Sequence, residues 1–313
     1  MTLLSTAGTT LRLGTRRSAL ARTQSGSVAA ALGRAGTAVD LVEVSTLGDR
    51  SAAAVAELGG TGVFVTGLRE QLLEGAVDLV VHSLKDLPTT PAPGLRLAAL
   101  PQREDPRDAL VDRAGRALAE LPAGATVGTG SPRRTAQLLA LGLGLVVVPV
   151  RGNVDTRLRR VADGELDSVV LARAGLARLG RLGEATEVLD PLQMLPAPGQ
   201  GALAVECRDD DESLAELLGR LDHPDTRAAV TAERSLLAAL EAGCTAPVGA
   251  LADVAEGETG ESEIYLRAVV LAPDGSRSLR LSATGPATTA GDIGRSLAAD
   301  LLAAGAADLM ENR

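Results

Sequence analysis

The stretch from Ala76 to Pro91 constrains the fold more than any other part of the chain. It begins with a largely apolar run, Val77 to Val81, which only Asp78 interrupts, and Pro88 and Pro91 close it. Such a run is typical of a buried strand, and proline cannot continue a ladder of backbone hydrogen bonds. We therefore expect a buried strand over 77–81 that runs out into a loop.

Polar residues follow this run directly: His82, Ser83, Lys85 and Asp86. Open α/β sheets bind their ligands at the carboxyl ends of strands, so the loop is a candidate site. Lys85 is the only lysine, because 30 of the 31 basic residues are arginines. A lysine kept against such a compositional bias favours a chemical role for Lys85, with chance as the alternative. We expect His82 to be structural.

A chain of 313 residues can form two or three domains, and with 1% aromatic residues its cores must consist of Leu, Val and Ala. No apolar run reaches the roughly 20 residues of a membrane span, and residues 1–10 do not resemble a signal peptide. Cys207 and Cys244 form no disulfide framework, and the cysteines and histidines lack the spacing of metal ligands. We expect a cytoplasmic protein without metal.

The net charge of −9 is unevenly distributed. Residues 201–313 carry nine arginines and twenty acidic residues, a net charge of −11, whereas residues 127–160 carry six arginines and a single acid, Asp155. Nucleic-acid binding is disfavoured, because a wide basic face and stacking aromatic residues are missing. A small polyanion is the more plausible partner.

Strand and helix signals alternate through the first two thirds, which predicts an α/β fold with parallel sheets. We expect domain 1 at 1–101 with a return segment at about 202–220, domain 2 at 102–201, and a small antiparallel α+β domain at 221–313. The expected strands lie at 11–14, 39–44, 77–81, 126–130, 145–150, 167–172, 199–206, 263–271 and 278–283. The expected helices lie at 18–32, 64–73, from 131, at 157–161, 223–240 and 290–305.

Arginines stand at three expected strand-to-helix junctions: Arg16 and Arg17, Arg133 and Arg134, and Arg151 with Arg157. Helix N-termini attract anions, and a guanidinium binds carboxylate or phosphate through two parallel hydrogen bonds. The alternative is that they are solvated surface arginines. Asp86 is either a salt-bridge partner or a group that stabilises a cation or moves a proton. Cys244 is either a buried apolar residue or a modifiable thiol in an exposed loop, which Gly243 and Pro247 favour.

Five motifs occur in order: His82-Ser-Leu-Lys-Asp-Leu-Pro88, Val127-Gly-Thr-Gly-Ser-Pro-Arg-Arg134, Arg151-Gly-Asn-Val-Asp-Thr-Arg157, Gly199-Gln-Gly-Ala202 and Glu241-Ala-Gly-Cys244. As an ordered set they closely resemble porphobilinogen deaminases, over nearly the whole chain. Three positions depart from the usual pattern. Thr61 and Glu57 stand where lysines often occur in the glycine-rich loop, and Gly130 replaces a common serine.

The resemblance implies two α/β domains like those of periplasmic binding proteins, flanking a cleft, plus the small C-terminal domain. It also implies a monomeric transferase that joins four porphobilinogen molecules head to tail, with loss of ammonia, on a dipyrromethane cofactor attached to Cys244. Asp86 would be catalytic. The cofactor carboxylates would be held by Ser83, Lys85, Thr129, Ser131, Arg133 and Arg134. The substrate would be bound by Arg16, Ser18, Phe64, Arg151, Arg157 and Gln200.

A binding module without chemistry is the main alternative, because the same fold and arginines would serve an anion sensor. The expected C-terminal domain with Cys244 argues against it. A chromophore bound to that cysteine would decide between the two.

Overall fold

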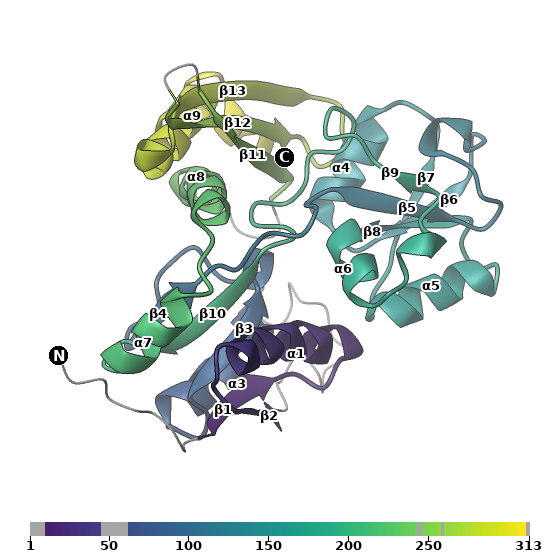
Figure 1. Cartoon of the computed structure of the whole chain (residues 1–313). Helices are drawn as coiled ribbons and strands as arrows, with labels where there is room; N and C mark the ends of the chain where they lie inside the picture. The colour runs from purple at the N-terminus through teal and green to yellow at the C-terminus, as the bar shows by residue number, and fades with distance from the viewer. Residues whose placement is uncertain (1–9, 45–61, 243–245, 258–259, 311–313) are drawn as a thin grey trace. The chain divides into compact units, whose positions relative to one another are not determined.

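The computed structural model describes residues 10–44, 62–242, 246–257 and 260–310, and of residues 62–64 only the backbone (Figure 1). The chain divides into two compact units. Unit 1 comprises residues 1–102 and 203–223, and unit 2 comprises residues 103–202 and 224–313. Among the described residues, no helix is long and apolar enough to cross a membrane.

Unit 1 contains a five-stranded sheet in the order β2-β1-β3-β10-β4. The strands β1, β2 and β3 are parallel, whereas β10 pairs antiparallel with both β3 and β4. The elements are β1 (Leu11–Thr15), α1 (Ala19–Arg34), β2 (Val39–Glu43), α3 (Gly62–Leu73), β3 (Leu79–Ser83), the short 3-10 helix η1 (Leu84–Asp86), β4 (Leu95–Ala99), β10 (Leu203–Arg208) and α7 (Glu212–Gly219).

Helices cover both faces of this sheet. Leu79 and Val81 of β3 pack in a cluster with residues of α1 and α7, whereas Val80 packs in a second cluster with residues of α3. Successive side chains of a strand point to opposite faces of the sheet. The consecutive apolar residues Leu79, Val80 and Val81 therefore pack against the helices on both faces. The apolar run that begins at Val77 therefore supplies the central strand, as expected.

The first part of unit 2 contains a second five-stranded sheet in the order β7-β6-β8-β5-β9. β6, β7 and β8 are parallel, and β5 runs antiparallel to β8 and β9. The elements are β5 (Asp108–Asp112), η2 (Leu118–Glu120), β6 (Thr126–Thr129), α4 (Pro132–Ala140), β7 (Val146–Pro149), α5 (Val154–Ala162), β8 (Ser168–Ala172), α6 (Arg173–Arg178), η3 (Leu182–Glu184) and β9 (Glu187–Val188).

The second part of unit 2 is a three-stranded antiparallel sheet with helices on one face. Its elements are α8 (Pro224–Ala239), β11 (Val248–Glu256), β12 (Ser262–Leu271), β13 (Ser278–Pro286), η4 (Ala287–Thr289), α9 (Ala290–Ala303) and α10 (Ala306–Met310). On the other face, Leu251 and Val269 pack against Ala136 of α4. The C-terminal sheet therefore packs with the α/β part of the same unit.

The α/β architecture with a small α+β part is confirmed, but several details of the prediction are wrong. β3 extends through Ser83, so His82 and Ser83 belong to the strand and not to the loop. The first sheet is mixed, because the return strand β10 enters it antiparallel. The strands β4, β5, β9 and β11 were not predicted. The division into three domains stays a prediction.

Candidate functional site

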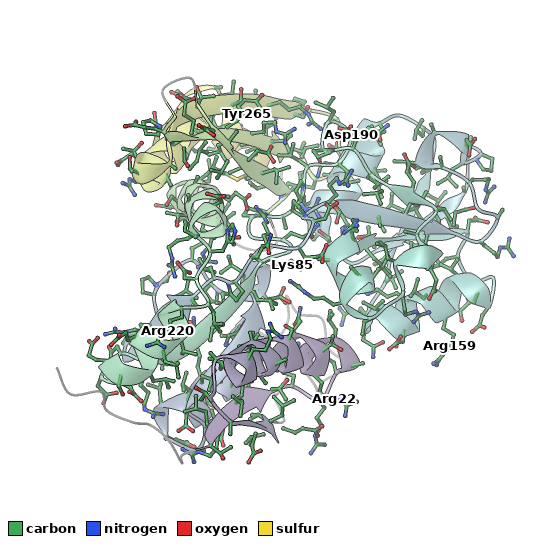
Figure 2. The ribbon with its side chains drawn as sticks, viewed as in Figure 1. Arg22, Lys85, Arg159, Asp190, Arg220 and Tyr265 are labelled. Atoms are coloured by element: carbon green, nitrogen blue, oxygen red, sulfur yellow. The ribbon has the colours of Figure 1, made fainter. Side chains whose placement is uncertain are left out.

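The carboxyl end of β3 presents the expected polar residues of unit 1. Ser83 ends the strand, and its hydroxyl oxygen accepts a hydrogen bond of 2.9 Å from Nε2 of Gln24, a buried residue of α1. Leu84 is fully buried and anchors the turn that follows. Lys85 and Asp86 are half-buried on η1, with Lys85 marked in Figure 2.

The carboxyl end of β1 lies at the same edge of the sheet, because β1 and β3 are parallel neighbours. Ser18 is the N-cap of α1, and its hydroxyl accepts a hydrogen bond of 3.2 Å from the backbone N–H of Ala21, as the sequence predicted. Arg16 is half-buried just before it. The fold thus brings Arg16 and Ser18 to the carboxyl ends of the parallel strands, where Asp86 also lies.

Two expected residues are not placed by the structure. Cys244 lies outside the described residues, and Phe64 belongs to α3 but its side chain is not described. Their roles therefore stay predictions.

In unit 2, the junction between β6 and α4 holds four expected residues. Ser131 is the N-cap of α4, with Pro132 in the first turn, as predicted. The backbone N–H of Ser131 donates a hydrogen bond of 3.2 Å to Oγ1 of Thr129, a buried residue. Arg133 and Arg134 follow in the first turn of the helix, where both guanidinium groups turn inward.

Asp108 receives both of these guanidinium groups. Nη2 of Arg133 lies 2.8 Å from Oδ2 of Asp108, and Nη2 of Arg134 lies 2.7 Å from Oδ1. The two arginines are 4% and 5% exposed, and Asp108 is fully buried. Burial alone would raise the pKa of Asp108, but the two guanidinium groups outweigh it and hold that pKa well below its ordinary value.

The charges of this cluster do not balance. Two guanidinium groups share one carboxylate, and burial lowers the pKa of Arg133. Nε of Arg133 is buried and has no hydrogen-bond partner. A surplus positive charge with an unused buried N–H suits a further carboxylate, because guanidinium binds that group through parallel hydrogen bonds. The net positive charge of this cluster therefore fits a cofactor that carries carboxylates.

Gln200 joins the same cluster. Its Nε2 donates hydrogen bonds of 2.6 Å to the carbonyl oxygen of Pro106 and 2.8 Å to Oδ1 of Asp108, and the residue is 1% exposed. These contacts tie residue 200 to the first residues of unit 2. The expected contact between Gln200 and the substrate stays a prediction.

The junction between β7 and α5 lies against the β6–α4 junction. Asn153 caps α5, accepting a hydrogen bond of 2.9 Å from the backbone N–H of Thr156, and Nε of Arg157 donates to the carbonyl oxygen of Gly152 at 2.9 Å. A Cβ atom at Gly130 would lie 2.6 Å from the carbonyl oxygen of Val150 and 3.9 Å from Nη2 of Arg157. The two junctions thus meet, and Gly130 permits their close approach.

The four arginines at the β6–α4 and β7–α5 junctions differ in solvent exposure. Arg151 is exposed and Arg157 is half-buried, unlike the buried Arg133 and Arg134. The first two can therefore reach a ligand from solvent, whereas the other two hold a carboxylate of the protein.

Sequence reasoning missed two arginines of α6, the helix that follows β8. Nη1 of Arg173 lies 2.8 Å from Oε1 of Glu104, and Nη2 of Arg178 donates to the carbonyl oxygen of Gly201 at 2.6 Å. Burial lowers the pKa of Arg178. Arg173 directly follows a strand that the sequence predicted, so its position was the signal that could have identified it.

Comparisons with known proteins agree with the motifs. Residues 11–216 match a family model described as the porphobilinogen deaminase, dipyromethane cofactor binding domain, and residues 227–303 match the porphobilinogen deaminase C-terminal domain. The porphobilinogen deaminase of Nocardia farcinica is 58% identical over 307 residues, 97% of this chain and 88% of that protein. The porphobilinogen deaminase of Mycobacterium tuberculosis is 57% identical over 304 residues, 96% of this chain and 98% of that protein.

One solved structure illustrates how distant the structural neighbours are. A putative methionine-binding lipoprotein of Bacillus subtilis aligns with 66% of this chain and 89% of its own, at 14% identity and a TM-score of 0.40. A likeness at this level carries no argument about function.

Proposed function

Because the chain belongs to the porphobilinogen deaminase family, we propose that it is a hydroxymethylbilane synthase, which joins four porphobilinogen molecules head to tail with loss of ammonia. The observation that carries the proposal is the match to both family domains over nearly the whole chain. The arginines of unit 2 support it, because each pyrrole of the growing chain carries two carboxylates.

Cys244 is the proposed attachment point of the dipyrromethane cofactor. When bound, this group supplies the pyrrole to which the first substrate is joined. The other cysteine, Cys207, is fully buried in β10, and burial raises the pKa of its thiol to about 11. The thiolate is the reactive form, so Cys207 is a poor nucleophile at neutral pH. This leaves Cys244 for the thioether bond.

Six side chains are proposed to bind carboxylates of the cofactor. In unit 1 these are Ser83 and Lys85, and in unit 2 they are Thr129, Ser131, Arg133 and Arg134. Asp108 keeps both guanidinium groups in place while leaving one positive charge uncompensated.

The substrate would be bound by Arg16, Ser18 and Phe64 of unit 1 and by Arg151, Arg157 and Gln200 of unit 2. Arg151 supports this role best, since it is exposed and its guanidinium can reach a carboxylate from solvent. Bidentate pairing would orient the substrate as well as attract it.

Asp86 would act on the reaction itself. Positive charge develops on the substrate pyrrole as ammonia leaves, and a fixed carboxylate stabilises that charge more than water does. The half-buried position of Asp86, on a turn anchored by Leu84, supports this role because the backbone that carries the carboxylate is fixed before the charge forms. We also propose that the protein is a cytoplasmic monomer of three domains.

The test combines intact mass and turnover. Wild-type protein and Cys207→Ser, purified from cells that make porphobilinogen, are expected to carry an adduct of two pyrrole units, and Cys244→Ser is not. Asp86→Asn, reconstituted with the preformed tetrapyrrole, is expected to lose about 10²–10³ in turnover, the usual effect of removing one preorganised electrostatic contact. An unmodified wild-type mass, which a binding module would give, contradicts the proposal. Near-normal turnover of Asp86→Asn would remove that residue from the mechanism.

A further inference from the structure

Unit 1 contains a buried charged cluster between α3 and its sheet. Arg69 of α3 reaches Glu206 of β10 with two parallel hydrogen bonds, from Nη2 to Oε1 at 2.6 Å and from Nε to Oε2 at 2.9 Å. The side chains are 16% and 5% exposed. The α3 side of the same sheet also carries an apolar cluster: Val44, Leu68, Leu72, Val77, Val80 and Leu95.

His82 is the third member of this cluster. Its Nε2 lies 3.3 Å from Oε2 of Glu206, but it is not aligned for a hydrogen bond and has no other hydrogen-bond partner. Burial would raise the pKa of Glu206, but the contacts with His82 and Arg69 lower it to about 2. Glu206 is therefore ionised at neutral pH, and the imidazole lies against a fixed negative charge.

Stability alone does not account for these charges. Replacing a buried ion pair with apolar side chains of similar volume is often neutral or stabilising, because burying charge is unfavourable. A bidentate pair also fixes the relative orientation of its two groups, because it forms two parallel hydrogen bonds. The cluster therefore suits a positioning role better than a purely stabilising one.

The position of His82 indicates which segment the cluster would orient, namely the end of β3 and the η1 turn after it. His82 and Ser83 are successive residues of β3, so their side chains point to opposite faces of the sheet. On the α1 face, Ser83 is held by Gln24. On the α3 face, His82 is held against Glu206. The last two residues of β3 are thus fixed from both sides, immediately before the turn of η1.

We propose that Glu206 is a positioning residue: through His82 it fixes the turn that carries Asp86. Arg69 orients the Glu206 carboxylate, and it also ties this point to α3. The inference rests on the proposed role of Asp86 and adds to it a group that does not touch the substrate. Glu206 is absent from the motifs that identify the family here, because it lies on a strand remote in sequence from the turn.

The first test compares Glu206→Gln with Cys207→Ala. Cys207 is the next residue of β10, is also fully buried, and packs on the opposite face of the sheet. Glu206→Gln is expected to keep its cofactor by intact mass and its KM, while kcat falls about 10–100-fold, the range typical of outer residues that orient a metal ligand. Amide hydrogen exchange over 82–87 is expected to accelerate. Cys207→Ala is expected to lose stability without either change.

The second test removes the cluster without destabilising the fold. The double variant Arg69→Met, Glu206→Leu replaces the ion pair with apolar side chains, so its unfolding midpoint is expected to match or exceed that of the wild type. Its kcat and its exchange over 82–87 are expected to change as in Glu206→Gln. Wild-type kcat and wild-type exchange in either folded variant would overturn the inference, as would equal effects of Glu206→Gln and Cys207→Ala.

The exchange measurement also separates this inference from the proposed function. If Asp86→Asn retained full turnover, the mechanism would fail, yet faster exchange over 82–87 in Glu206→Gln would still show that Glu206 orders the turn. Normal exchange together with an inactive Asp86→Asn would reject the positioning role and leave the proposed function intact.

Discussion

Asp108→Asn is expected to destabilise unit 2 more than any surface substitution. The carboxylate accepts three hydrogen bonds from guanidinium groups, one from Arg133 and two from Arg134, and a fourth from Gln200. An asparagine keeps one acceptor oxygen but no charge. If that oxygen takes the place of Oδ1, the two bonds from Arg134 each weaken by about 1 kcal/mol, and the bond from Arg133 is lost because the amide NH2 group donates and cannot accept. Leaving buried charge unpaired typically costs about 3–5 kcal/mol, which sets our expected range.

Asp112→Asn is the matched control, because Asp112 lies at the other end of β5 and is 5% exposed. Its partner Arg116 pairs with it at 3.0 Å, but the side chain of Arg116 is 28% exposed. Water can therefore solvate that guanidinium when the charge is lost, and we expect a cost of about 1 kcal/mol. The comparison isolates burial of the arginines from loss of a carboxylate.

The assay is urea denaturation followed by far-ultraviolet circular dichroism, because the chain has no tryptophan and a single tyrosine. Adding Arg134→Leu to Asp108→Asn removes one of the two released charges. The double variant is therefore expected to be more stable than the sum of the single effects, by about 0.5–3 kcal/mol. If Asp108→Asn cost no more than Asp112→Asn, or if the two changes were additive, Asp108 would not be what holds the two arginines.

Two further predictions concern pH and a close backbone approach. The pKa of Glu206 falls from 4.5 to about 2 on folding. At about 1.4 kcal/mol per pKa unit, the carboxylate stabilises unit 1 by about 3 kcal/mol above pH 4.5, and this is lost as the pH falls towards 2. Urea denaturation at a series of pH values should show the loss, and Glu206→Gln should flatten it; an equal slope in both proteins would contradict the assignment. Gly130→Ala places a Cβ atom 2.6 Å from the carbonyl oxygen of Val150, whereas Gly26→Ala in α1 meets nothing within 4 Å. In thermal unfolding, we expect Gly130→Ala to lower the free energy of unfolding by about 1–3 kcal/mol and Gly26→Ala to raise it by about 0.5–1 kcal/mol. Effects of the same sign would refute the steric argument.

Sequence reasoning succeeded where the signal is local. Ser18 and Ser131 were predicted as N-caps from the residues around them, and both caps are confirmed by their hydrogen bonds. The buried strand that begins in an apolar run was also found, although its end was placed two residues early. His82 and Ser83 were assigned to the loop because they are polar. Their partners, Glu206 and Gln24, lie in distant segments of the chain, which no local sequence pattern reveals.

The strand β5 was missed for the same physical reason. It begins and ends with Asp108 and Asp112, and a charged residue normally indicates an exposed position. Asp108 is buried only because Arg133 and Arg134 neutralise it from 25 and 26 residues away. The sequence indicated that arginines gather at the strand ends of unit 2, but it could not indicate that two of them pair with the protein itself.

The return of β10 to the first sheet has a consequence for synthesis on the ribosome. β4 ends at Ala99 and β10, its neighbour in the sheet, begins at Leu203. At about 5–20 residues per second, these two strands leave the ribosome roughly 5–20 seconds apart. During that interval β3 and β4 lack the strand that joins them, and the α/β sheet of unit 2 receives its last strand at Val188, before β10 is made. The nascent chain therefore exposes unpaired strand edges of its first unit until the α/β sheet of its second unit has all its strands, and such edges are prone to pair with other chains.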